Sequence, residues 1–256
     1  MTEAMRTDIG SHDLEHIWVR DLDLTAEVMG HMNFGEVLFL LITARVPEPD
    51  EARLVNAVLV SLMEHGLTPS AVVTRVTYGL VPDSIQGAIS AGLLGVGGVV
   101  LGSMEGCGEL LTQMHTAVSA GATAEDAARD VVDEYRADGR RLPGFGHAMH
   151  TGGDPRAVRL LAIAKECGKS GAHVEALGAL GVAADAAIGK HLPVNITGAV
   201  SAVLLELGIP WRLHRGFALV SRTAGLVAHI GEEMEHPITP AFRALTRGES
   251  GGPGTS

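Results

Sequence analysis

Apolar residues recur along the first half of this chain at the spacing of an amphipathic α-helix. Between Asp50 and Gly66, six apolar residues fall on one helical face: Leu54, Val55, Val58, Leu59, Leu62 and Met63. Asp50, which follows a proline, can cap the start of such a helix, and Gly66 can end it. The pattern therefore predicts a helix with one buried face between these two residues.

Helix signals continue in the second half of the chain. Asp154 and Pro155 form a start signal, an N-cap followed by proline at the first helical position, and Gly168 can end that segment. Two further helices are expected over residues 197–207 and 214–230, separated by a Gly-Ile-Pro break. No sustained alternation of apolar and polar residues and no Asn-Gly hairpin signal indicates a strand. We therefore predict an all-α fold.

Glycines gather over residues 88–108. A phosphate-cradling loop is one interpretation, but the run from Gly95 to Val100 fails the GxGxxG spacing and no strand precedes it. The favoured interpretation is close helix packing or a break between helices, because glycine lets two backbones approach each other.

The composition is that of a folded, acidic protein. Of the 256 residues, 46% are hydrophobic and 19% are charged, which excludes a disordered chain. The formal net charge of −11 argues against a nucleic-acid partner, because a phosphate backbone rewards basic surfaces. A local cluster of Arg and His side chains can still hold a small anion on an acidic protein.

Nothing in the chain indicates export or insertion into a membrane. The first ten residues lack the apolar core of a secretory signal, and the most apolar stretch, 85–101, is shorter than the roughly 20 residues of a membrane span. The two cysteines, Cys107 and Cys167, have no disulfide or zinc spacing and fit a reducing compartment. We expect a cytoplasmic protein without a membrane partner.

Two histidines four residues apart, His12 and His16, are superficially similar to the pair in a zinc-binding helix. No third ligand is evident downstream, and Asp13 stands where such helices carry glutamate. We therefore expect no metal.

The most distinctive stretch is Pro-Gly-Phe-Gly-His at 143–147, followed by Asp-Pro-Arg at 154–156. A histidine on a glycine-rich turn thus precedes a capped helix whose second residue is arginine. The helix start presents unsatisfied N–H groups, Arg156 offers a planar fork for a carboxylate, and His147 can hydrogen-bond a carbonyl oxygen. The combination is typical of a site for an anion that carries a carbonyl group.

These residues resemble the signature of the citrate synthase superfamily, in which PG(F/Y)GH precedes DPR by the same spacing. Other segments are similar to the family's landmarks in order and position: 34–47, 64–70, 192–195 and 221–229. The resemblance covers residues 15–245 and is strongest to short members of the citryl-CoA-lyase type.

The resemblance implies two helical domains and a homodimer. The large domain would comprise residues 1–111 and 211–256, and the small domain residues 112–210. Active sites are expected in the clefts between the domains, with coenzyme A bound mainly by the small domain.

Carried over position by position, the resemblance assigns the ligand-binding half of a site. Four residues match the family positions that bind an oxaloacetate-like dicarboxylate: His65, His147, Arg156 and Arg222. Two guanidinium groups can neutralise two carboxylates, and two imidazoles can hydrogen-bond a carbonyl or hydroxyl oxygen. Five residues are expected to contact the coenzyme A thioester: Gly144, Phe145, Gly146, Lys190 and Asn195. For Lys190, a solvated surface lysine is the alternative.

The proton-transfer half of the family's site is not matched. The family's HGGA-x-E motif supplies a histidine that stabilises a thioester enolate, but residues 99–105 read VVLGSME. The family's NVD motif supplies an aspartate, but this chain has Thr197 after Asn195 and Ile196. A neutral hydroxyl cannot act as a carboxylate base, and a general base contributes roughly 10²–10⁴-fold. Ala148 also stands where short relatives often carry arginine. Two of the family's three catalytic residues are therefore expected to be absent.

Three explanations follow for this altered site. Glu105 or His191 substitutes for the lost groups, the protein catalyses a different reaction on a related acyl-CoA, or it binds a dicarboxylate or an acyl-CoA without turnover. The preferred function is a carbon–carbon lyase or synthase acting on a hydroxy- or oxo-dicarboxylate and a coenzyme A thioester. In this function His147 polarises the carbonyl at the scissile carbon, and Glu105 is the hypothetical proton donor to the enolate.

Overall fold

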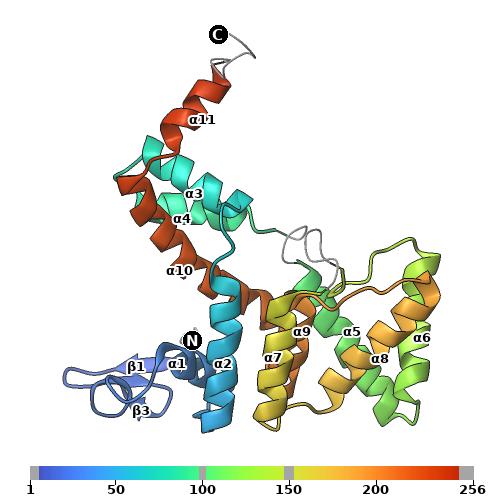
Figure 1. The fold of residues 1–256 in the computed structure, drawn as a ribbon. Coiled ribbons are helices and arrows are strands. Elements are labelled where there is room, and N and C mark those ends of the chain that lie inside the picture. The colour runs from blue at the N-terminus through green and yellow to red at the C-terminus, as the bar shows by residue number, and fades with distance from the viewer. Residues whose placement is uncertain (1–5, 98–101, 147–152, 248–256) are drawn as a thin grey trace, which may run out of the picture. The chain divides into compact units, whose positions relative to one another are not determined.

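The computed structural model describes residues 6–97, 102–146 and 153–247. Its α-helices are α1 (Phe34–Thr43), α2 (Pro49–Met63), α3 (Pro69–Leu80), α4 (Ile85–Leu94), α5 (Gly102–Ser119), α6 (Ala124–Ala137), α7 (Pro155–Glu166), α8 (Ala172–Ile188), α9 (Ile196–Glu206), α10 (His214–Glu235) and α11 (Thr239–Thr246) (Figure 1). Two short helices, η1 (Leu24–Val28) and η2 (Trp211–Leu213), accompany them. The predicted all-α class is confirmed.

By its internal contacts the chain forms two compact units. The first unit comprises Met1–Leu59 and Met104–His214, and the second unit comprises Val60–Ser103 and Arg215–Ser256. Each unit therefore combines segments that are distant in the sequence. The domain division expected from the family, 1–111 with 211–256 against 112–210, has other boundaries and stays a prediction.

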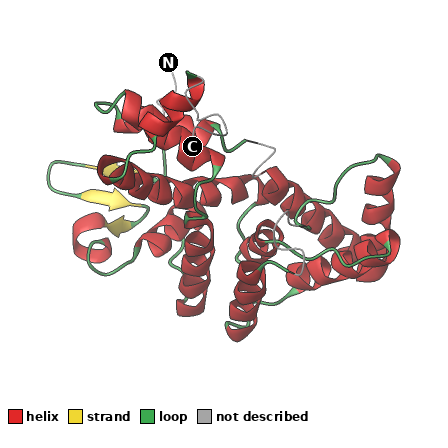
Figure 2. Ribbon diagram, turned by 45° about the horizontal axis from the view of Figure 1, so that its top comes forward, coloured by secondary structure: helices red, strands yellow, loops and turns green. Residues whose placement is uncertain are grey.

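A small antiparallel sheet precedes the helices and is drawn in yellow in Figure 2. β1 (Gly10–His12) pairs with β2 (Ile17–Val19), which pairs with β3 (Leu22–Asp23). No strand signal was found in this segment of the sequence. Strands of two or three residues are too short to show the alternation of apolar and polar side chains from which strands are predicted.

The predicted helices form, with small shifts at their ends. α2 buries five of the six residues on its predicted face: Leu54, Val55, Val58, Leu59 and Leu62. α7 begins at Pro155 with Asp154 as its N-cap, and Gly168 follows its end with a left-handed φ of 64°. α10 continues to Glu235, beyond the expected end. Within the described ranges, no helix combines the length and the apolar character that a membrane span requires.

α9 is the central helix of the first unit. All residues from Ile196 to Leu204 are buried, which is expected for a helix that is apolar around its whole circumference. α7 and α8 pack against α9, and α6 packs against α8. The apolar core includes Leu111 from α5, Val132 from α6 and Leu180 from α8. The first turns of α5, α7 and α9 hold Glu105, Arg156 and Thr197.

In the second unit, α3 and α4 pack closely against each other, and α11 lies against α3. A Cβ atom at Gly92 of α4 would lie 2.8 Å from the carbonyl oxygen of Ser70 and would overlap the hydroxyl of Thr74. The interpretation of the glycines as sites of close helix packing is confirmed at this position.

An ion-pair network around a buried arginine joins α3 to α10. Arg75 of α3 is only 2% exposed, and its guanidinium donates to the carboxylates of Glu232 (2.7 Å) and Glu233 (2.8 Å) and to the carbonyl of His236 (2.6 Å). Glu233 also accepts hydrogen bonds from the amides of Ile238 and Thr239 at the start of α11. The three helices are therefore fixed to one another by charge-assisted hydrogen bonds.

Candidate active site

The glycine-rich turn at 143–146 is joined to the segment before α9 by backbone hydrogen bonds. The amide of Asn195 donates to the carbonyl of Gly144 (3.0 Å), and the amide of Gly146 donates to the carbonyl of Pro193 (2.8 Å). The side-chain amide of Asn195 also donates to the carbonyl of Gly146 (2.9 Å). Both glycines have left-handed φ angles, 86° and 74°, which residues with a Cβ rarely adopt. Asn195 and the turn, which are far apart in the sequence, are thus held together.

The same turn packs tightly against α5 and α9. A Cβ atom at Gly144 would lie 2.6 Å from the sulfur of Cys107 and 3.0 Å from Cα of Gly198. A Cβ atom at Gly106 of α5 would lie 3.4 Å from the side-chain carbons of Pro143. Glu105, the hypothetical proton donor, immediately precedes Gly106 in the first turn of α5. The structure therefore brings Glu105 and the turn to the same region of the first unit.

Thr197, which the resemblance assigns to the position of the family's aspartate, is bound within the first turn of α9. Asn195 caps this helix: its side-chain oxygen accepts the amides of Thr197 (3.0 Å) and Gly198 (3.2 Å). The hydroxyl of Thr197 donates to the same oxygen at 2.6 Å, and the residue is 8% exposed. A buried hydroxyl that acts as a donor in a cap supplies no carboxylate for proton transfer.

Asp154 does more than cap α7. It is fully buried, and it accepts the backbone amide of Arg156 (3.0 Å) together with Nε (3.1 Å) and Nη2 (2.9 Å) of the same guanidinium. It also accepts the amide of Ile196 at the start of α9 (3.1 Å). Burial raises the pKa of Asp154. The hydrogen bonds and positive charge of Arg156, together with the hydrogen bond from the Ile196 amide, outweigh this effect, so the pKa lies below its ordinary value.

Arg156 is therefore oriented by Asp154. The carboxylate occupies the Nε–Nη2 edge of the guanidinium, and the side chain remains 24% exposed. A guanidinium has a second edge, formed by its two terminal nitrogens, which can bind another carboxylate in a bidentate manner. The sequence identified Asp154 only as a cap. The pairing with Arg156 two residues later was the available signal for its second role.

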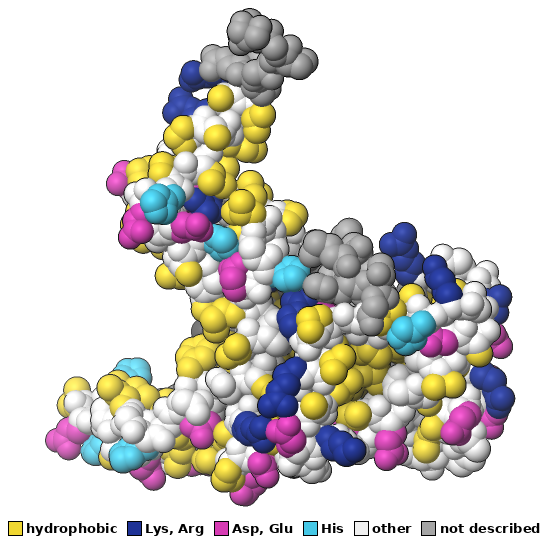
Figure 3. Space-filling model, viewed as in Figure 1, with side chains coloured by type: hydrophobic (Ala, Val, Ile, Leu, Met, Phe, Trp, Pro, Cys, Tyr) yellow, Lys and Arg dark blue, Asp and Glu magenta, His cyan; other side chains and the backbone are white. Residues whose placement is uncertain are grey.

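A cavity of about 620 Å³ opens beside the turn and Lys190. Phe145, Gly146 and Lys190, all predicted to contact coenzyme A, line it. Three arginines at the end of α6 and in the loop after it line it as well: Arg136, Arg140 and Arg141. Arg140 lies over the ring of Tyr135, 4.0 Å from its centre, and pairs with Glu134 and Asp138. Figure 3 shows dark-blue cationic side chains around α6.

Sequence reasoning missed the three arginines of this cavity. They stand in a charged segment that reads as a solvated helix end. Their proximity to Lys190 results from the packing of α6 against α8, since Lys190 follows the end of α8. The only local signal was the density of arginine over 136–141.

In the second unit, His65 and Arg222 lie on adjoining elements. α2 ends at Met63, and His65 occupies the turn that follows it. A Cβ atom at Gly225 of α10 would overlap the carbonyl oxygen of Met63 and lie 3.1 Å from the carboxylate of Glu64, so α10 runs directly against the end of α2. Arg222 precedes Gly225 by three residues and therefore lies on the same side of α10.

The predicted site residues thus fall into two groups, one in each unit. The first unit holds Glu105, Arg156, Lys190 and Asn195 with the 144–146 turn, and the second holds His65 and Arg222. His147, Ala148 and residues 99–101 lie outside the described residues. The convergence of both groups on one ligand stays a prediction.

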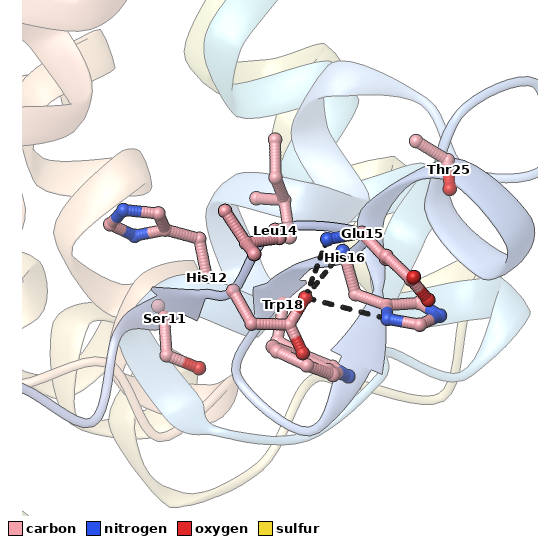
Figure 4. Close-up of a pocket in the computed structure, with 10 residues that line it drawn as sticks. Ser11, His12, Leu14, Glu15, His16, Trp18 and Thr25 are labelled. Carbon is pink, nitrogen blue, oxygen red and sulfur yellow. Dashed lines mark hydrogen bonds and ion pairs between the residues drawn. The ribbon is translucent and has the colours of Figure 1, made fainter.

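The His12–His16 segment is a β-hairpin rather than a helix, so its spacing does not place both rings on one helical face. His16 stacks on Trp18 and lies 3.5 Å from Asp13, while His12 points away from His16 (Figure 4). These residues line a cavity of about 590 Å³. In the part of the chain that the structure describes, no three His, Cys, Asp or Glu side chains are grouped to hold a metal ion.

Known proteins share the sequence pattern of this chain. A family model described as citrate synthase, C-terminal domain, matches residues 20–244. The citrate synthase of Haloferax volcanii is 28% identical over 211 residues, covering 79% of this chain and 52% of that protein. Citrate synthase 2 of Bacillus subtilis is 27% identical over 194 residues, covering 74% of this chain and 49% of that protein. The chain spans about half the length of the curated relatives it matches.

Among solved structures, citryl-CoA lyase from Hydrogenobacter thermophilus matches almost the whole chain. Its TM-score is 0.86 at 29% sequence identity, and the match covers 99% of this chain and 96% of that one. The fold and the order of the motifs agree with the family match. The chain belongs to the citrate synthase family.

Proposed function

We propose that this protein is a carbon–carbon lyase or synthase of the citryl-CoA type. It would act on a hydroxy- or oxo-dicarboxylate and an acyl-CoA thioester. The observation that carries the proposal is the cationic cavity beside the 144–146 turn, because it provides a site for a phosphate-bearing ligand next to the family's signature. The structural match to the citryl-CoA lyase of H. thermophilus, with a TM-score of 0.86 at 29% identity, supports the same reaction class. The homodimer and the cytoplasmic location remain predictions.

Coenzyme A suits the chemistry of this cavity. Arg136, Arg141 and Lys190 can neutralise its phosphates, and the rings of Tyr135 and Phe145 can contact its adenine. The volume of about 620 Å³ lies within the range of roughly 300–1,000 Å³ for small-molecule pockets. Because the whole chain carries a net charge of −11, this group of cations does not follow from the composition and supports a local role in anion binding.

The dicarboxylate is assigned to the four residues carried over from the family: His65, His147, Arg156 and Arg222. The second edge of the Arg156 guanidinium suits one carboxylate, and Arg222 suits the other. Asp154 supports this assignment because it fixes Arg156 before any ligand arrives, which lowers the entropy lost on binding.

Cleavage removes one proton from the citryl hydroxyl and returns one proton to the enolate carbon. His147 takes the proton of the citryl hydroxyl as that oxygen becomes the carbonyl of the oxo-dicarboxylate. The electron pair of the breaking carbon–carbon bond passes to the thioester fragment as an enolate. Glu105 donates a proton to the enolate carbon. A Glu105→Gln variant with full activity would remove Glu105 from this role.

A second candidate is a protein that binds the dicarboxylate or acyl-CoA without turnover. Thr197 favours it, because the buried hydroxyl at the family's aspartate position donates to Asn195 and offers no base. Such a protein would be stabilised against heat by citryl-CoA, and mass spectrometry would find the citryl-CoA unchanged after incubation. A repurposed enzyme with a different reaction would instead release other products.

Binding of coenzyme A to variants of the cavity tests the proposal. We expect Lys190→Gln and Arg141→Gln each to weaken binding about tenfold, as loss of a charge-assisted contact implies. The control is Arg129→Gln, because the Arg129 side chain is 65% exposed on α6 and pairs with Asp126 outside the cavity. Isothermal titration measures all three. If Lys190→Gln binds coenzyme A as tightly as Arg129→Gln does, the cavity is not the coenzyme site.

A further inference from the structure

We propose that Glu64 and His229 are positioning residues that hold the turn carrying His65 in its ligand-binding geometry. The inference rests on the proposed function, in which His65 touches the dicarboxylate. Neither residue is itself expected to contact the ligand. Their role follows from contacts within the second unit.

Glu64 fixes the backbone on both sides of His65. One carboxylate oxygen, Oε1, accepts the amide of His65 at 2.7 Å and the amide of Gly66 at 2.5 Å. The two peptide planes that flank His65 are therefore bound to a single charged acceptor, which forms stronger hydrogen bonds than a neutral one. Gly66 has a left-handed φ of 71°, so the chain turns sharply after His65.

His229 holds the other oxygen of the same carboxylate. Its Nε2 lies 3.1 Å from Oε2 of Glu64, an ion-pair contact that is close but not well aligned as a hydrogen bond. The imidazole is 9% exposed, and its Nδ1 lies 3.5 Å from Oε2 of Glu232. Glu232 in turn pairs with the buried Arg75, so the chain of contacts extends from the end of α2 to α3.

α10 connects this support to the other ligand residue of the unit. Arg222, Gly225 and His229 recur at the spacing of one helical face. The absence of a side chain at Gly225 lets α10 approach the Met63 carbonyl and the Glu64 carboxylate directly. One helix therefore carries Arg222 and also anchors the turn that carries His65.

The charge state of Glu64 agrees with this role. Burial raises the pKa of the carboxyl. The His65 amide, the His229 imidazole and the Gly66 amide lower it by a larger amount, so the pKa lies below its ordinary value. Glu64 is thus a carboxylate at neutral pH and can accept both amides.

Substitutions at Glu64 separate its two contacts. Glu64→Ala removes the acceptor for both amides, whereas Glu64→Gln keeps an acceptor oxygen and removes the charge that attracts His229. We expect Glu64→Ala to weaken oxaloacetate binding by about 10–100-fold and Glu64→Gln by a smaller factor. Affinity for coenzyme A should be unchanged, because its cavity belongs to the first unit. Glu235→Gln, at an exposed position of α10, is the matched control.

Calorimetry with oxaloacetate and with coenzyme A gives both affinities for each variant, and hydrogen exchange at the His65 and Gly66 amides gives an independent readout. The expected result is a selective loss of oxaloacetate affinity together with faster exchange at these two amides. Combining Glu64→Gln with His229→Gln should cost less than the two losses added, because both remove the same contact.

The binding measurements distinguish a failure of the positioning role from a failure of the proposed function. If the unmodified protein binds oxaloacetate but Glu64→Ala binds it equally well, the positioning role is wrong and the proposed function stands. If the loss extends equally to coenzyme A, Glu64 supports the fold and not the ligand, and the inference is overturned. If the unmodified protein neither binds oxaloacetate nor converts citryl-CoA, the proposed function fails, and the positioning role fails with it.

Discussion

Buried carboxylates in this molecule hold several partners at once. Asp154 accepts hydrogen bonds from Arg156 and from the amide of Ile196, and it thereby joins the starts of α7 and α9. Glu51, 3% exposed, accepts both terminal nitrogens of Arg45 (2.6 and 2.9 Å) and the ammonium of Lys169 (3.0 Å). Such groups make stability depend on pH, because their pKa values differ between the folded and unfolded chains.

Glu51 gives a specific prediction for that dependence. The hydrogen bonds from Arg45 have the largest effect on the pKa of Glu51. Together with those from the Glu48 amide and Lys169 they outweigh the opposing effect of burial and lower this pKa from 4.5 to about 2. The unfolded chain binds this proton more tightly, so the stabilisation is complete above about pH 4.5 and is lost as the pH falls towards 2. At pH 7 we expect Glu51→Gln to lower the free energy of unfolding by up to about 3 kcal/mol.

Urea denaturation of the two proteins between neutral and acid pH measures this effect. The difference in unfolding free energy should shrink as the pH falls, because protonated Glu51 and glutamine are both neutral. A difference that stays constant down to the lowest pH would show that the ion pair is not its source.

At the scale of helices, the site depends on close approaches that only glycine permits. The turn at Gly144 lies against the first turn of α9, and a Cβ atom at Gly198 would overlap the carbonyl oxygen of Gly144. The same turn is fixed by the hydrogen bonds of Asn195. Any shift of α9 would therefore move the turn that lines the cationic cavity.

Two glycine-to-alanine substitutions distinguish the effect of this close contact on stability from the effect of helix propensity. We expect Gly198→Ala to destabilise the protein by about 1–3 kcal/mol through overpacking, and to weaken coenzyme A binding by moving the turn. Gly178→Ala in α8 is the control, because nothing lies near its Cβ position, and alanine should stabilise a helix there by up to about 1 kcal/mol. Thermal unfolding and calorimetry measure both variants. Equal effects at the two positions would contradict the close contact.

The sequence predicted helices best where local signals mark their ends. Asp154, Pro155 and Gly168 define α7 because capping and stop signals act within one turn. It missed the short sheet before α1, where strands of two or three residues carry no periodic pattern. It also missed the supports of the site. The contact between Glu64 and His229 joins residues far apart in the chain, and only tertiary packing brings them together.

At the scale of the whole molecule, charge is distributed unevenly. The chain is strongly acidic, yet arginines and Lys190 surround one cavity beside the signature turn. The predicted ligand residues are divided between two units, with Arg156 in the first and Arg222 in the second. A reaction that joins or separates two anionic fragments requires both groups to act on one molecule. This requirement is the central claim of the proposed function.

Product analysis after incubation with citryl-CoA tests that claim most directly. Mass spectrometry should detect acetyl-CoA and oxaloacetate in equal amounts from the unmodified protein. Arg156→Ala and Arg222→Ala, which remove one guanidinium from each unit, should each slow their formation by at least about 100-fold. Unchanged citryl-CoA, despite thermal stabilisation of the protein by this compound, would contradict the claim and identify a binding protein without turnover.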